Sequence, residues 1–530
     1  MEIVECRLSN STFTMRIKKQ IERRMKLKSK TFLGSFGLLA FSTVCAQKQP
    51  NILYIMSDDH GTQAMSCYGH PLSKLLQTPN IDRIASEGML MQNCFVTNSI
   101  STPSRACILT GQYSHKNGAY TLNDPLEPNH PNVAKELQKV GYQTALVGKW
   151  HLHKEPTGFD YSSVLIGQGE YYNPRFIDNG NWNGGDEKSA RFNSVEGYCT
   201  DIIADKTMAW LDKRDKSKPF FMACHFKAPH RPCIPAKRHE NSLKDVEIPY
   251  PANFNDTHEG KGEYTKSLHM TFDWLEKADL KELSVQGLSV EEKRKVAYQE
   301  YMKDYLRVVA AVDENVGRLL KYLDDNGLTE NTIVVYTSDQ GFFLGEHGWF
   351  DKRIMYEQPL KMPFMIRYPK EIKAASTNKD FLLNIDFAPT FLDYAGVKKT
   401  PTFMQGESFR KNIVGKTPAN WRKSMYYRYW MNDDYPHHVC AHYGVRTERY
   451  KLIYFYGLSL GRMNHDRKLP PCFEFYDLKS DPDEMKNQYD NPEYKKIIIG
   501  LKKELLCLKK QYDDEDRKYP EMIELNNKMW

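Results

Sequence analysis

Short apolar runs that end abruptly in polar residues recur four times along the chain. They are Asn51–Met56, Gln143–Val147, Pro219–Ala223 and Thr332–Thr337. Short continuous apolar runs are typical of strands that are buried on both faces of a sheet. Because helical segments alternate with such runs up to about residue 370, the pattern predicts a doubly wound α/β sheet, mostly parallel and flanked by helices.

One helix of this layer is predicted in detail. Its apolar face consists of Tyr305, Val308, Val309, Val312, Val316, Leu319, Leu320 and Leu323. Asn326-Gly327 ends it before the Thr332 run. The charged stretch before it, from about residue 255 to 300, is expected to be an insertion, either a solvated pair of helices or a cover over a ligand cleft.

The pattern of apolar and polar residues changes beyond about residue 415. The segment 442–456 contains two β-rich runs around a polar turn, and Phe473–Asp477 adds a further strand. Apolar residues at helical spacing between Tyr494 and Tyr512 predict a closing helix. We therefore expect a larger α/β domain over 47–415 and a smaller α+β subdomain over 416–530.

The polar residues that follow the four runs are candidates for a functional site. In chain order they are Asp58, Asp59, Lys149, His151, His225, Lys227, His230, Asp339 and Gln340. In an open α/β sheet the ligand site lies beyond the carboxyl ends of the parallel strands. If the four runs are neighbours in the sheet, seven of these side chains, all except His225 and Lys227, converge at one edge.

A fifth candidate segment, Ser101–Gly111, reads Ser-Thr-Pro-Ser-Arg-Ala-Cys-Ile-Leu-Thr-Gly. Pro103 favours the first turn of a helix and Gly111 its end, so Ser101 is predicted at or just before a helix N-terminus. Unpaired backbone N–H groups favour an anion at that position. Arg105 lies about one turn further on, although an ordinary capped helix would carry the same residues.

Charge and cysteine content exclude several other classes of protein. Residues 1–46 contain nine Lys or Arg and three Glu, so they carry +6 of the net charge of +7. The remainder, at +1, gives no global electrostatic argument for nucleic-acid binding. The eleven cysteines show no Cys-x-x-Cys spacing, which argues against zinc fingers and a disulfide scaffold.

The first 46 residues are typical of a leader with a signal peptide. Three lysines at 26, 28 and 30 precede the apolar stretch 32–41, and small residues precede a cleavage point before Gln47. Translation is expected to start at Met25. The apolar stretch is too short for a stable membrane span. We expect export to the periplasm, with a lipoprotein anchor at Cys45 as the alternative that Ser42 disfavours.

Two motifs carry a resemblance to a known family. Ser101-x-Pro-Ser-Arg-x-x-x-Leu-Thr-Gly111 and Gly141-Tyr-x-Thr-x-x-x-Gly-Lys-Trp-His151 resemble the type I sulfatases of the alkaline-phosphatase-like superfamily. The resemblance runs from about Pro50 to the C-terminal region. It implies a large mixed sheet flanked by helices and a smaller C-terminal antiparallel sheet with a helix. Serine at 101, where many members have cysteine, resembles the serine-type branch.

The resemblance also implies a nucleophile and a metal. Ser101 would be oxidised by a serine-type maturase to formylglycine (3-oxoalanine), whose hydrate attacks sulfur. Asp58, Asp59, Asp339 and Gln340 match the family's side-chain ligands to calcium, which modified Ser101 would join. Four oxygen ligands suit a hard cation, calcium more naturally than zinc. Gln340 stands where many relatives carry Asn or His.

The remaining catalytic roles follow from the same resemblance. Arg105, Lys149 and Lys352 would balance charge on the sulfate and in the transition state. Lys352 is matched through the segment Asp351-Lys-Arg-Ile-Met-Tyr-Glu357. His230, alone or with Lys352, would protonate the departing sugar oxygen, and His151 would take the proton from the second hydrate hydroxyl. His60 and His115 are expected to be structural.

The substrate is the least constrained part of the prediction. Thr337–Trp349 and His438-x-x-x-His442 look most like N-acetylglucosamine-6-sulfatases and mucin-desulfating sulfatases. We expect sulfate ester hydrolysis on a glycosaminoglycan or mucin chain, with N-sulfoglucosamine or 2-O or 3-O sulfate as alternatives. A phosphatase or phosphonate hydrolase of the superfamily, or a non-catalytic glycan-binding protein, are the rival classes.

Five segments or residues are candidates for contact with the sugar. His347, Asp351, His438 and His442 could hydrogen-bond its hydroxyls, or they could brace the junction between the two domains. The loop 167–173 could also line the cleft.

Overall fold

The large sheet is the frame on which the rest of the chain is arranged. The computed structural model describes residues 49–435, 437–462 and 469–530, and the predicted leader with Met25 and Cys45 lies outside them. In these residues ten strands form one sheet in the order β13-β2-β12-β9-β1-β8-β4-β5-β6-β7. Their bounds are β1 Asn51–Asp58, β2 Met89–Met91, β4 Gln143–Lys149, β5 Tyr161–Leu165, β6 Arg175–Asp178, β7 Asn193–Ser194, β8 Phe220–Pro229, β9 Thr332–Ser338, β12 Phe364–Arg367 and β13 Ser376–Asn378.

The four apolar runs are neighbours in the middle of this sheet. Strands β9, β1, β8 and β4 lie side by side and are parallel, as is β5 beyond β4. Strands β12, β6 and β7 are antiparallel to their neighbours, so the sheet is mixed and mostly parallel, as predicted. Every residue of β1 and β9 is buried, which explains their continuous apolar sequence.

One strand is longer than its sequence indicates. The third apolar run was expected to end at Ala223, but β8 continues to Pro229. His225 and Lys227 are therefore inside the strand rather than beyond it, and both are buried. The ammonium of Lys227 lies 4.7 Å from the ring centroid of Tyr171, so the strand can bury this charge against an aromatic face.

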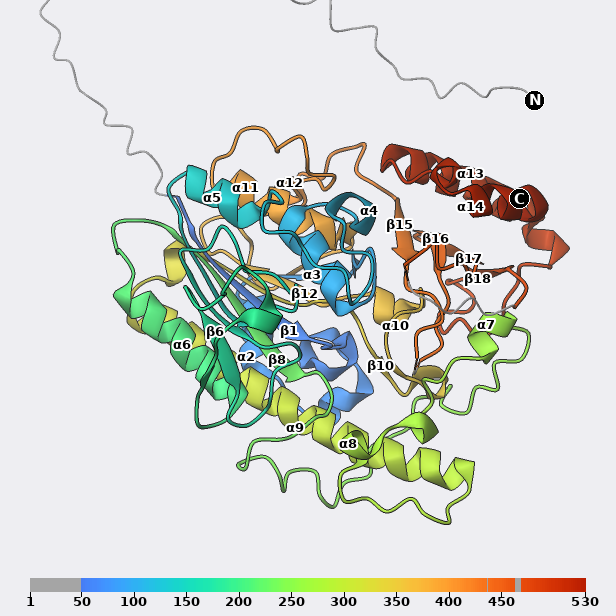
Figure 1. Cartoon of the computed structure of the whole chain (residues 1–530), viewed down its shortest axis with the longest axis horizontal. Coiled ribbons are helices and arrows are strands. Elements are labelled where there is room, and N and C mark those ends of the chain that lie inside the picture. The colour runs from blue at the N-terminus through green and yellow to red at the C-terminus, as the bar shows by residue number, and fades with distance from the viewer. Residues whose placement is uncertain (1–48, 436, 463–468) are drawn as a thin grey trace, which may run out of the picture. The chain divides into compact units, whose positions relative to one another are not determined.

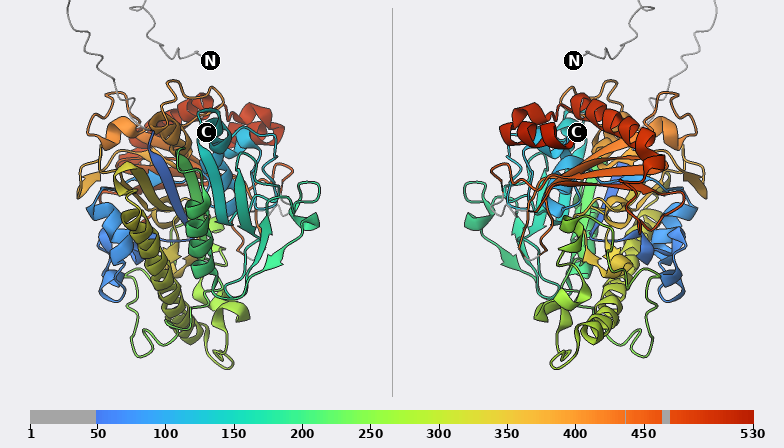
Figure 2. Two further views of the ribbon diagram at one scale, coloured as in Figure 1. Left: turned by 90° about the vertical axis from the view of Figure 1, so that its left-hand side faces the viewer. Right: turned by 90° about the vertical axis from the view of Figure 1, so that its right-hand side faces the viewer.

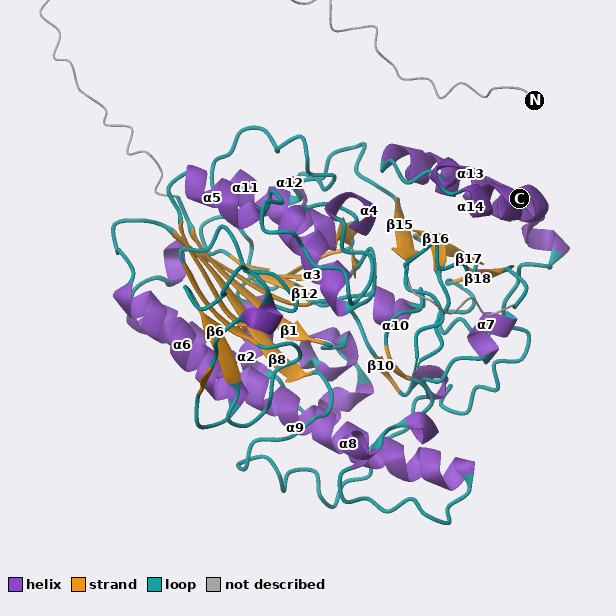
Figure 3. Cartoon of the chain, viewed as in Figure 1, coloured by secondary structure: helices purple, strands orange, loops and turns teal. Residues whose placement is uncertain are grey.

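Helices cover both faces of the sheet (Figures 1 and 3). One layer contains α2 (Pro79–Ser86), α6 (Cys199–Lys213) and α9 (Val290–Asp325), and the other contains α3 (Ser101–Thr110), α5 (Val133–Lys139) and α11 (Phe387–Tyr394). Two separate apolar cores result, one on each face. All eight residues of the predicted apolar face of α9 are completely buried.

The charged stretch before α9 is not the pair of helices expected as one alternative. Before α9 it consists mainly of loops, interrupted by two helices of only four residues each, α7 (Glu263–Lys266) and α8 (Lys277–Leu280), and by a 3-10 helix at Phe272–Trp274. Helix α9 itself begins at Val290, where Ser289 and Glu292 form a capping box. Three further helices of this part have four residues each: α4 (Ser114–Asn117), α10 (Glu357–Leu360) and α12 (Arg410–Ile413). It also contains two short strand pairs, β3–β14 (Cys94–Phe95, Leu382–Leu383) and β10–β11 (Phe343–Leu344, Phe350–Asp351).

The C-terminal part forms its own sheet. Within the described ranges it contains four antiparallel strands, β15 (Ser424–Tyr429), β16 (His442–Thr447), β17 (Tyr450–Phe455) and β18 (Cys472–Asp477). Helix α13 (Lys495–Gln511) lies across one face of it, followed by α14 (Pro520–Met529) (Figure 2). The hairpin and covering helix match the sequence pattern. Residues 49–530 form one compact unit, and the boundary near residue 415 stays a prediction.

Candidate active site

The carboxyl ends of β1 and β9 bring three carboxylates together. Asp58 is the last residue of β1, and Asp339 follows β9; both are completely buried, as is Asp59. The backbone N–H of Asp59 donates to Oδ1 of Asp339 at 3.1 Å. Asp59 adopts φ 65°, a left-handed conformation that non-glycine residues adopt rarely and often at functional sites.

Helix α3 presents a buried guanidinium to this cluster. Arg105 donates from Nε to Oδ2 of Asp339 at 3.0 Å, and one terminal nitrogen lies 3.4 Å from Oδ1 of Asp58. Its other terminal nitrogen donates to the carbonyl oxygen of Lys149 at 3.0 Å. Because α3 begins at Ser101, these bonds fix the position of its N-terminus relative to three strand ends.

Two lysines and an amide complete the polar shell. The ammonium of Lys149 donates to Asp58, and that of Lys352 lies 2.7 Å and 2.5 Å from the two carboxylate oxygens of Asp59. The amide nitrogen of Gln340 donates to Asp59 and, at 2.8 Å, to Asp339. Three buried carboxylates thus face three buried cations, a balance that removes most of the cost of burying each charge.

The pKa values of the cluster are driven apart by its geometry. Burial raises the pKa of the Asp58 carboxyl, but the charge of Lys149 opposes it and the resulting pKa lies well below the usual range. Burial and the neighbouring Asp58 charge raise the pKa of Asp339 to about 7. Burial also lowers the pKa of Lys149 to about 8. Carboxylates and ammonium groups with such shifts are common at catalytic sites.

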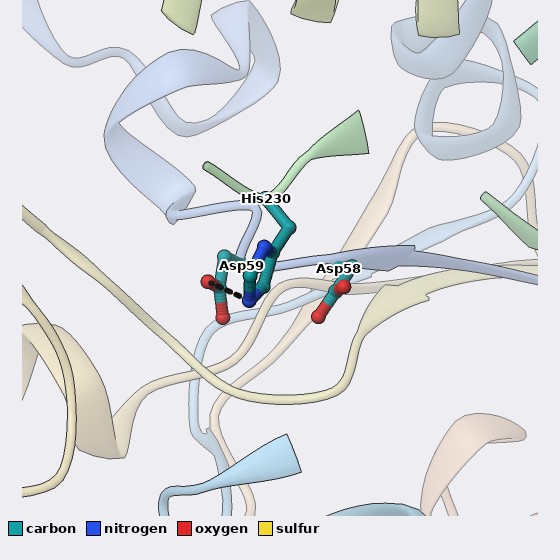
Figure 4. A group of neighbouring side chains, drawn as sticks. All are labelled: Asp58, Asp59 and His230. Carbon is teal, nitrogen blue, oxygen red and sulfur yellow. Dashed lines mark ion pairs between the residues drawn. The ribbon is translucent and has the colours of Figure 1, made fainter. Parts of the chain in front are cut away.

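The donor set fits a metal ion. One ligand atom from each of Asp58, Asp59 and His230 lies within 4.8 Å of the others. Figure 4 shows the three neighbouring side chains. Oδ1 of Asp58 and Oε1 of Gln340 are buried and accept no hydrogen bond from the described residues. Unsatisfied buried oxygens beside a carboxylate cluster are what a bound cation would satisfy.

Both predicted catalytic histidines lie at this cluster. His230 follows β8; its Nδ1–H donates to the carbonyl of Arg231 at 2.6 Å, and Nε2 faces Asp59 at 3.8 Å. His151 follows β4 at φ 56°, and its carbonyl accepts from Thr102, the second residue of α3, at 3.0 Å. Burial, with the charge of Lys149, lowers the pKa of both imidazoles well below its usual value. His60 and His115 instead hydrogen-bond to Tyr336 and to the carbonyl of Tyr512.

Ser101 opens onto a cavity of about 340 Å³ beside the cluster. Its wall consists of Ile100, Ser101, Leu122, Gln168, His230, Arg231, Pro232, Glu276, Ala278, Asp279, Asp351, Lys352, Arg353 and His437. The loop 167–173 and the 255–300 stretch thus both reach the cavity, through Gln168 and through α8. Arg353 and His437 were not identified as site residues from the sequence. Their positions next to Lys352 and His438, two residues that were identified, were the available signal.

The four predicted sugar contacts are placed differently from one another. Asp351 lines the cavity, where its carboxylate accepts from Arg353 at 3.0 Å. His347 and His442 are completely buried outside that lining, His347 against Asp256 at 2.7 Å and His442 against the carbonyl of Cys440 at 2.7 Å. His438 pairs with Asp433 at 2.9 Å, also outside it. These positions favour the alternative in which the three histidines brace the junction between the two domains and do not contact the sugar.

Comparison with known families decides the class. The sulfatase model matches residues 50–397, well over half of the chain. The chain belongs to the sulfatase family. A second model, the C-terminal region of N-sulphoglucosamine sulphohydrolase, matches residues 345–511. The protein is therefore a sulfuric ester hydrolase, and the resemblance carried by the two motifs is confirmed.

Individual relatives agree with this assignment. The sulfatase is 44% identical to N-acetylglucosamine-6-O-sulfatase of Bacteroides thetaiotaomicron, over 93% of each chain. It is 29% identical to human N-acetylglucosamine-6-sulfatase, over 75% of this chain and 69% of the human one. A solved structure of a protein with its substrate D-glucosamine-2-N,6-O-disulfate is also 44% identical, with a TM-score of 0.80, covering 89% of this chain and 100% of that one.

A phosphonate monoester hydrolase of Agrobacterium radiobacter shares the fold. Its TM-score is 0.70 at 22% identity, over 87% of this sulfatase and 96% of the hydrolase. This likeness supports the alkaline-phosphatase-like architecture and carries no information about the reaction.

Proposed function

We propose that this sulfatase removes the 6-O-sulfate from N-acetylglucosamine residues of glycosaminoglycan or mucin chains. The observation that carries the proposal is the 44% identity to an N-acetylglucosamine-6-O-sulfatase along 93% of both chains. The solved relative whose substrate is a 2-N,6-O-disulfated glucosamine supports the same class of sugar.

Ser101 is the proposed site of the nucleophile. It lies on the first turn of α3 with 1% of its surface exposed, and it contributes to the wall of the cavity. Oxidation to formylglycine by a serine-type maturase would supply an aldehyde hydrate as nucleophile there. The unpaired N–H groups of the first helical turn favour the negative charge of a sulfate group at this position.

Calcium is the proposed metal, held by Asp58, Asp59, Asp339 and Gln340. When bound, it would polarise a sulfate oxygen and stabilise the ionised nucleophile. The carboxylates and the amide oxygen form a hard donor set that favours calcium over zinc. Gln340 now turns its amide nitrogen toward Asp59 and Asp339, so rotation of the amide would direct Oε1 into the same space.

Two histidines are proposed to move the protons. His230 lines the cavity, and because its Nδ1–H is bonded to a carbonyl, Nε2 is the atom that can transfer a proton to the departing sugar oxygen. The negative charge of the sulfate on a bound substrate would raise the lowered pKa of His230. His230 would then be protonated and could supply that proton. His151 accepts the proton of the second hydroxyl of the aldehyde hydrate. The accepting atom is Nδ1, which is buried and makes no hydrogen bond among the described residues. The negative charge on the sulfate and in the transition state is balanced by Arg105, Lys149 and Lys352.

The sugar is proposed to lie against the wall formed by Asp351, Arg353 and His437. Arg353 bonds to Asp351 at 3.0 Å and to Asp434 at 3.2 Å, and His437 bonds to Asp434 at 2.9 Å. These side chains are held in fixed orientations, as recognition of hydroxyl groups requires.

Hydrolysis of an N-sulfate is the second candidate. The match of residues 345–511 to the C-terminal region of N-sulphoglucosamine sulphohydrolase favours it. D-Glucosamine-2-N,6-O-disulfate discriminates between the two, because mass spectrometry of the product identifies which sulfate has been lost.

The test begins with the modification. Mass spectrometry of the peptide that contains residues 101–111, from protein made with the serine-type maturase, should show the aldehyde at position 101. The same protein should then desulfate 6-sulfated N-acetylglucosamine faster than 2-O-, 3-O- or N-sulfated sugars or phosphate monoesters. Faster turnover of another linkage would overturn the substrate, and faster phosphate release would overturn the class of ester.

Export to the periplasm, through the leader outside the described residues, completes the proposal. Across the described ranges, each helix is too short or too polar to cross a bilayer.

A further inference from the structure

A second cavity, of about 380 Å³, has no wall residue in common with the cavity at Ser101. Its wall consists of Thr62, Gln63, His70, Pro71, Leu72, residues 249–253, Tyr298, Leu344, Glu346, Glu357, Gln358, Lys361 and Asp483. The volume is within the range of cavities that bind small molecules. The reaction proposed above uses none of these side chains.

An aromatic surface forms one side of this cavity. The ring of Tyr250 stacks on that of Tyr298 with centroids 4.9 Å apart and an angle of 29°. The ring of Phe254 packs against that of Tyr250 with centroids 4.8 Å apart and an angle of 50°. Although its ring is held in this way, Tyr250 keeps 37% of its surface exposed. A partly exposed tyrosine ring in a cavity wall is suited to packing against the C–H face of a ring-shaped ligand.

Two amide groups in the cavity wall lack partners. Nδ2 of Asn253 and Oε1 of Gln358 are buried and make no hydrogen bond with any described residue. Asn253 is only 8% exposed, so its donor cannot be satisfied by bulk water. Unsatisfied buried polar groups are uncommon and call for a ligand or an ordered water. Both residues line the cavity, so rotation of either amide toward it would offer one donor and one acceptor to a hydroxyl or acetamido group.

The charged groups of the wall are already engaged. Both oxygens of Glu346 accept hydrogen bonds, from Nε2 of Gln63 at 2.9 Å and from the N–H of Leu344 at 2.7 Å. Lys361 pairs with Glu357 at 3.3 Å. Burial lowers the pKa of His70, which favours its neutral form. Among the described residues the cavity therefore offers no uncompensated cation to a sulfate or a phosphate, and Asp483 adds a further negative charge.

We propose that this cavity binds an uncharged pyranose, such as an unsulfated sugar unit of a glycan. The tyrosine face packs against the ring, and Asn253 and Gln358 bond its polar substituents. The inference rests on the chemistry of the cavity alone, so it stands whichever linkage the sulfatase hydrolyses.

Saturation-transfer NMR with N,N′-diacetylchitobiose tests the proposal on the full-length protein. We expect binding that Tyr250→Ala weakens at least tenfold and that Asn253→Leu abolishes. Tyr250→Ala should leave kcat/KM for a monosaccharide 6-sulfate unchanged, because the residue lies outside the catalytic cavity. Asn241→Leu, at an exposed asparagine, is the matched control and should bind as the parent does.

Two further measurements separate this cavity from the catalytic one. Binding should persist in Asp351→Asn, whose changed side chain lines the cavity at Ser101. The 6-sulfated form of the sugar should compete poorly at the second cavity, because that wall lacks a free cation among the described residues. Absence of binding, or binding that Asp351→Asn removes and Tyr250→Ala leaves intact, would overturn the proposal. If Asn253→Leu does not fold, Tyr250→Ala, a change at a half-exposed residue, still decides.

Discussion

Nε of Arg105 lies 3.0 Å from Oδ2 of Asp339, so the helix that carries Ser101 is bonded directly to the end of strand β9. The same guanidinium reaches Asp58 at the end of β1 and the carbonyl of Lys149 at the end of β4. One side chain thereby fixes the position of Ser101 relative to the carboxylate cluster. A planar fork with several donors is needed to reach three acceptors at once.

Replacement of Arg105 by lysine should separate charge from geometry. The ammonium group introduced by Arg105→Lys would keep the positive charge but could not span the three acceptors, so we expect kcat/KM to fall by roughly 10²-fold or more. Steady-state kinetics on a 6-sulfated sugar would measure it. Arg175→Lys, at a half-exposed pair with Glu170, is the control and should be neutral. Unchanged kinetics in Arg105→Lys would contradict the assigned role.

Removal of the metal should reduce both activity and stability. A ligand present at 100 times its dissociation constant stabilises the folded state by about 2.7 kcal/mol, so a chelator should lower the unfolding temperature and calcium should restore it. Asp58→Asn should show neither response, and its metal content should fall in elemental analysis. Asp205→Asn, at an exposed pair with Arg318, should behave as the parent. A parent protein that is indifferent to chelation would count against the metal site.

His347 and Asp351 should give opposite kinetic signatures. Loss of the His347 side chain removes its hydrogen bond to Asp256 at 2.7 Å and leaves that carboxylate with Lys261 at 3.0 Å, so His347→Ala should cost about 1–3 kcal/mol of folding stability with KM unchanged. Asp351→Asn should raise KM because Asp351 lines the cavity, and it should also lower the unfolding temperature because it removes the charge that pairs with Arg353 at 3.0 Å. Denaturant titration and steady-state kinetics test both variants. A raised KM in His347→Ala would return that residue to the sugar site.

Asp313 should make stability depend on pH in a region remote from the cluster. Its carboxylate accepts from the N–H groups of Asn80 and Ile81 at 3.1 Å and 2.8 Å, at the start of α2. Burial nevertheless raises its pKa from 3.8 to about 6. The folded state therefore favours the protonated form, and this contribution to stability is complete below pH 3.8 and lost as pH rises through 6.

The size of that effect follows from the shift in pKa. The rise in the pKa of Asp313 from 3.8 to about 6 corresponds to a loss of about 3 kcal/mol of unfolding free energy between pH 3.8 and pH 6. In Asp313→Asn this dependence should disappear, so the difference in unfolding free energy between parent and variant should change with pH over that interval. A constant difference would show that the pKa of Asp313 is not raised.

Local pattern was sufficient for much of this protein. Continuous apolar runs predict buried strands because a strand covered on both faces has no polar side, and β1, β4 and β9 follow that rule to within two residues. The motif around Ser101 predicts its helix through Pro103 and Gly111. The cluster residues were predicted because polar side chains at parallel strand ends must meet if the strands are neighbours.

Only the tertiary structure decided which polar residues share a cavity. His347 and Asp351 are four residues apart, yet one is sealed against Asp256 and the other faces the space beside Ser101. Arg353, His437 and the α8 segment reach the same wall from distant parts of the chain. Spacing along a loop does not specify which way a side chain points. Packing between segments far apart in sequence does, because each buried polar group must find its partner there.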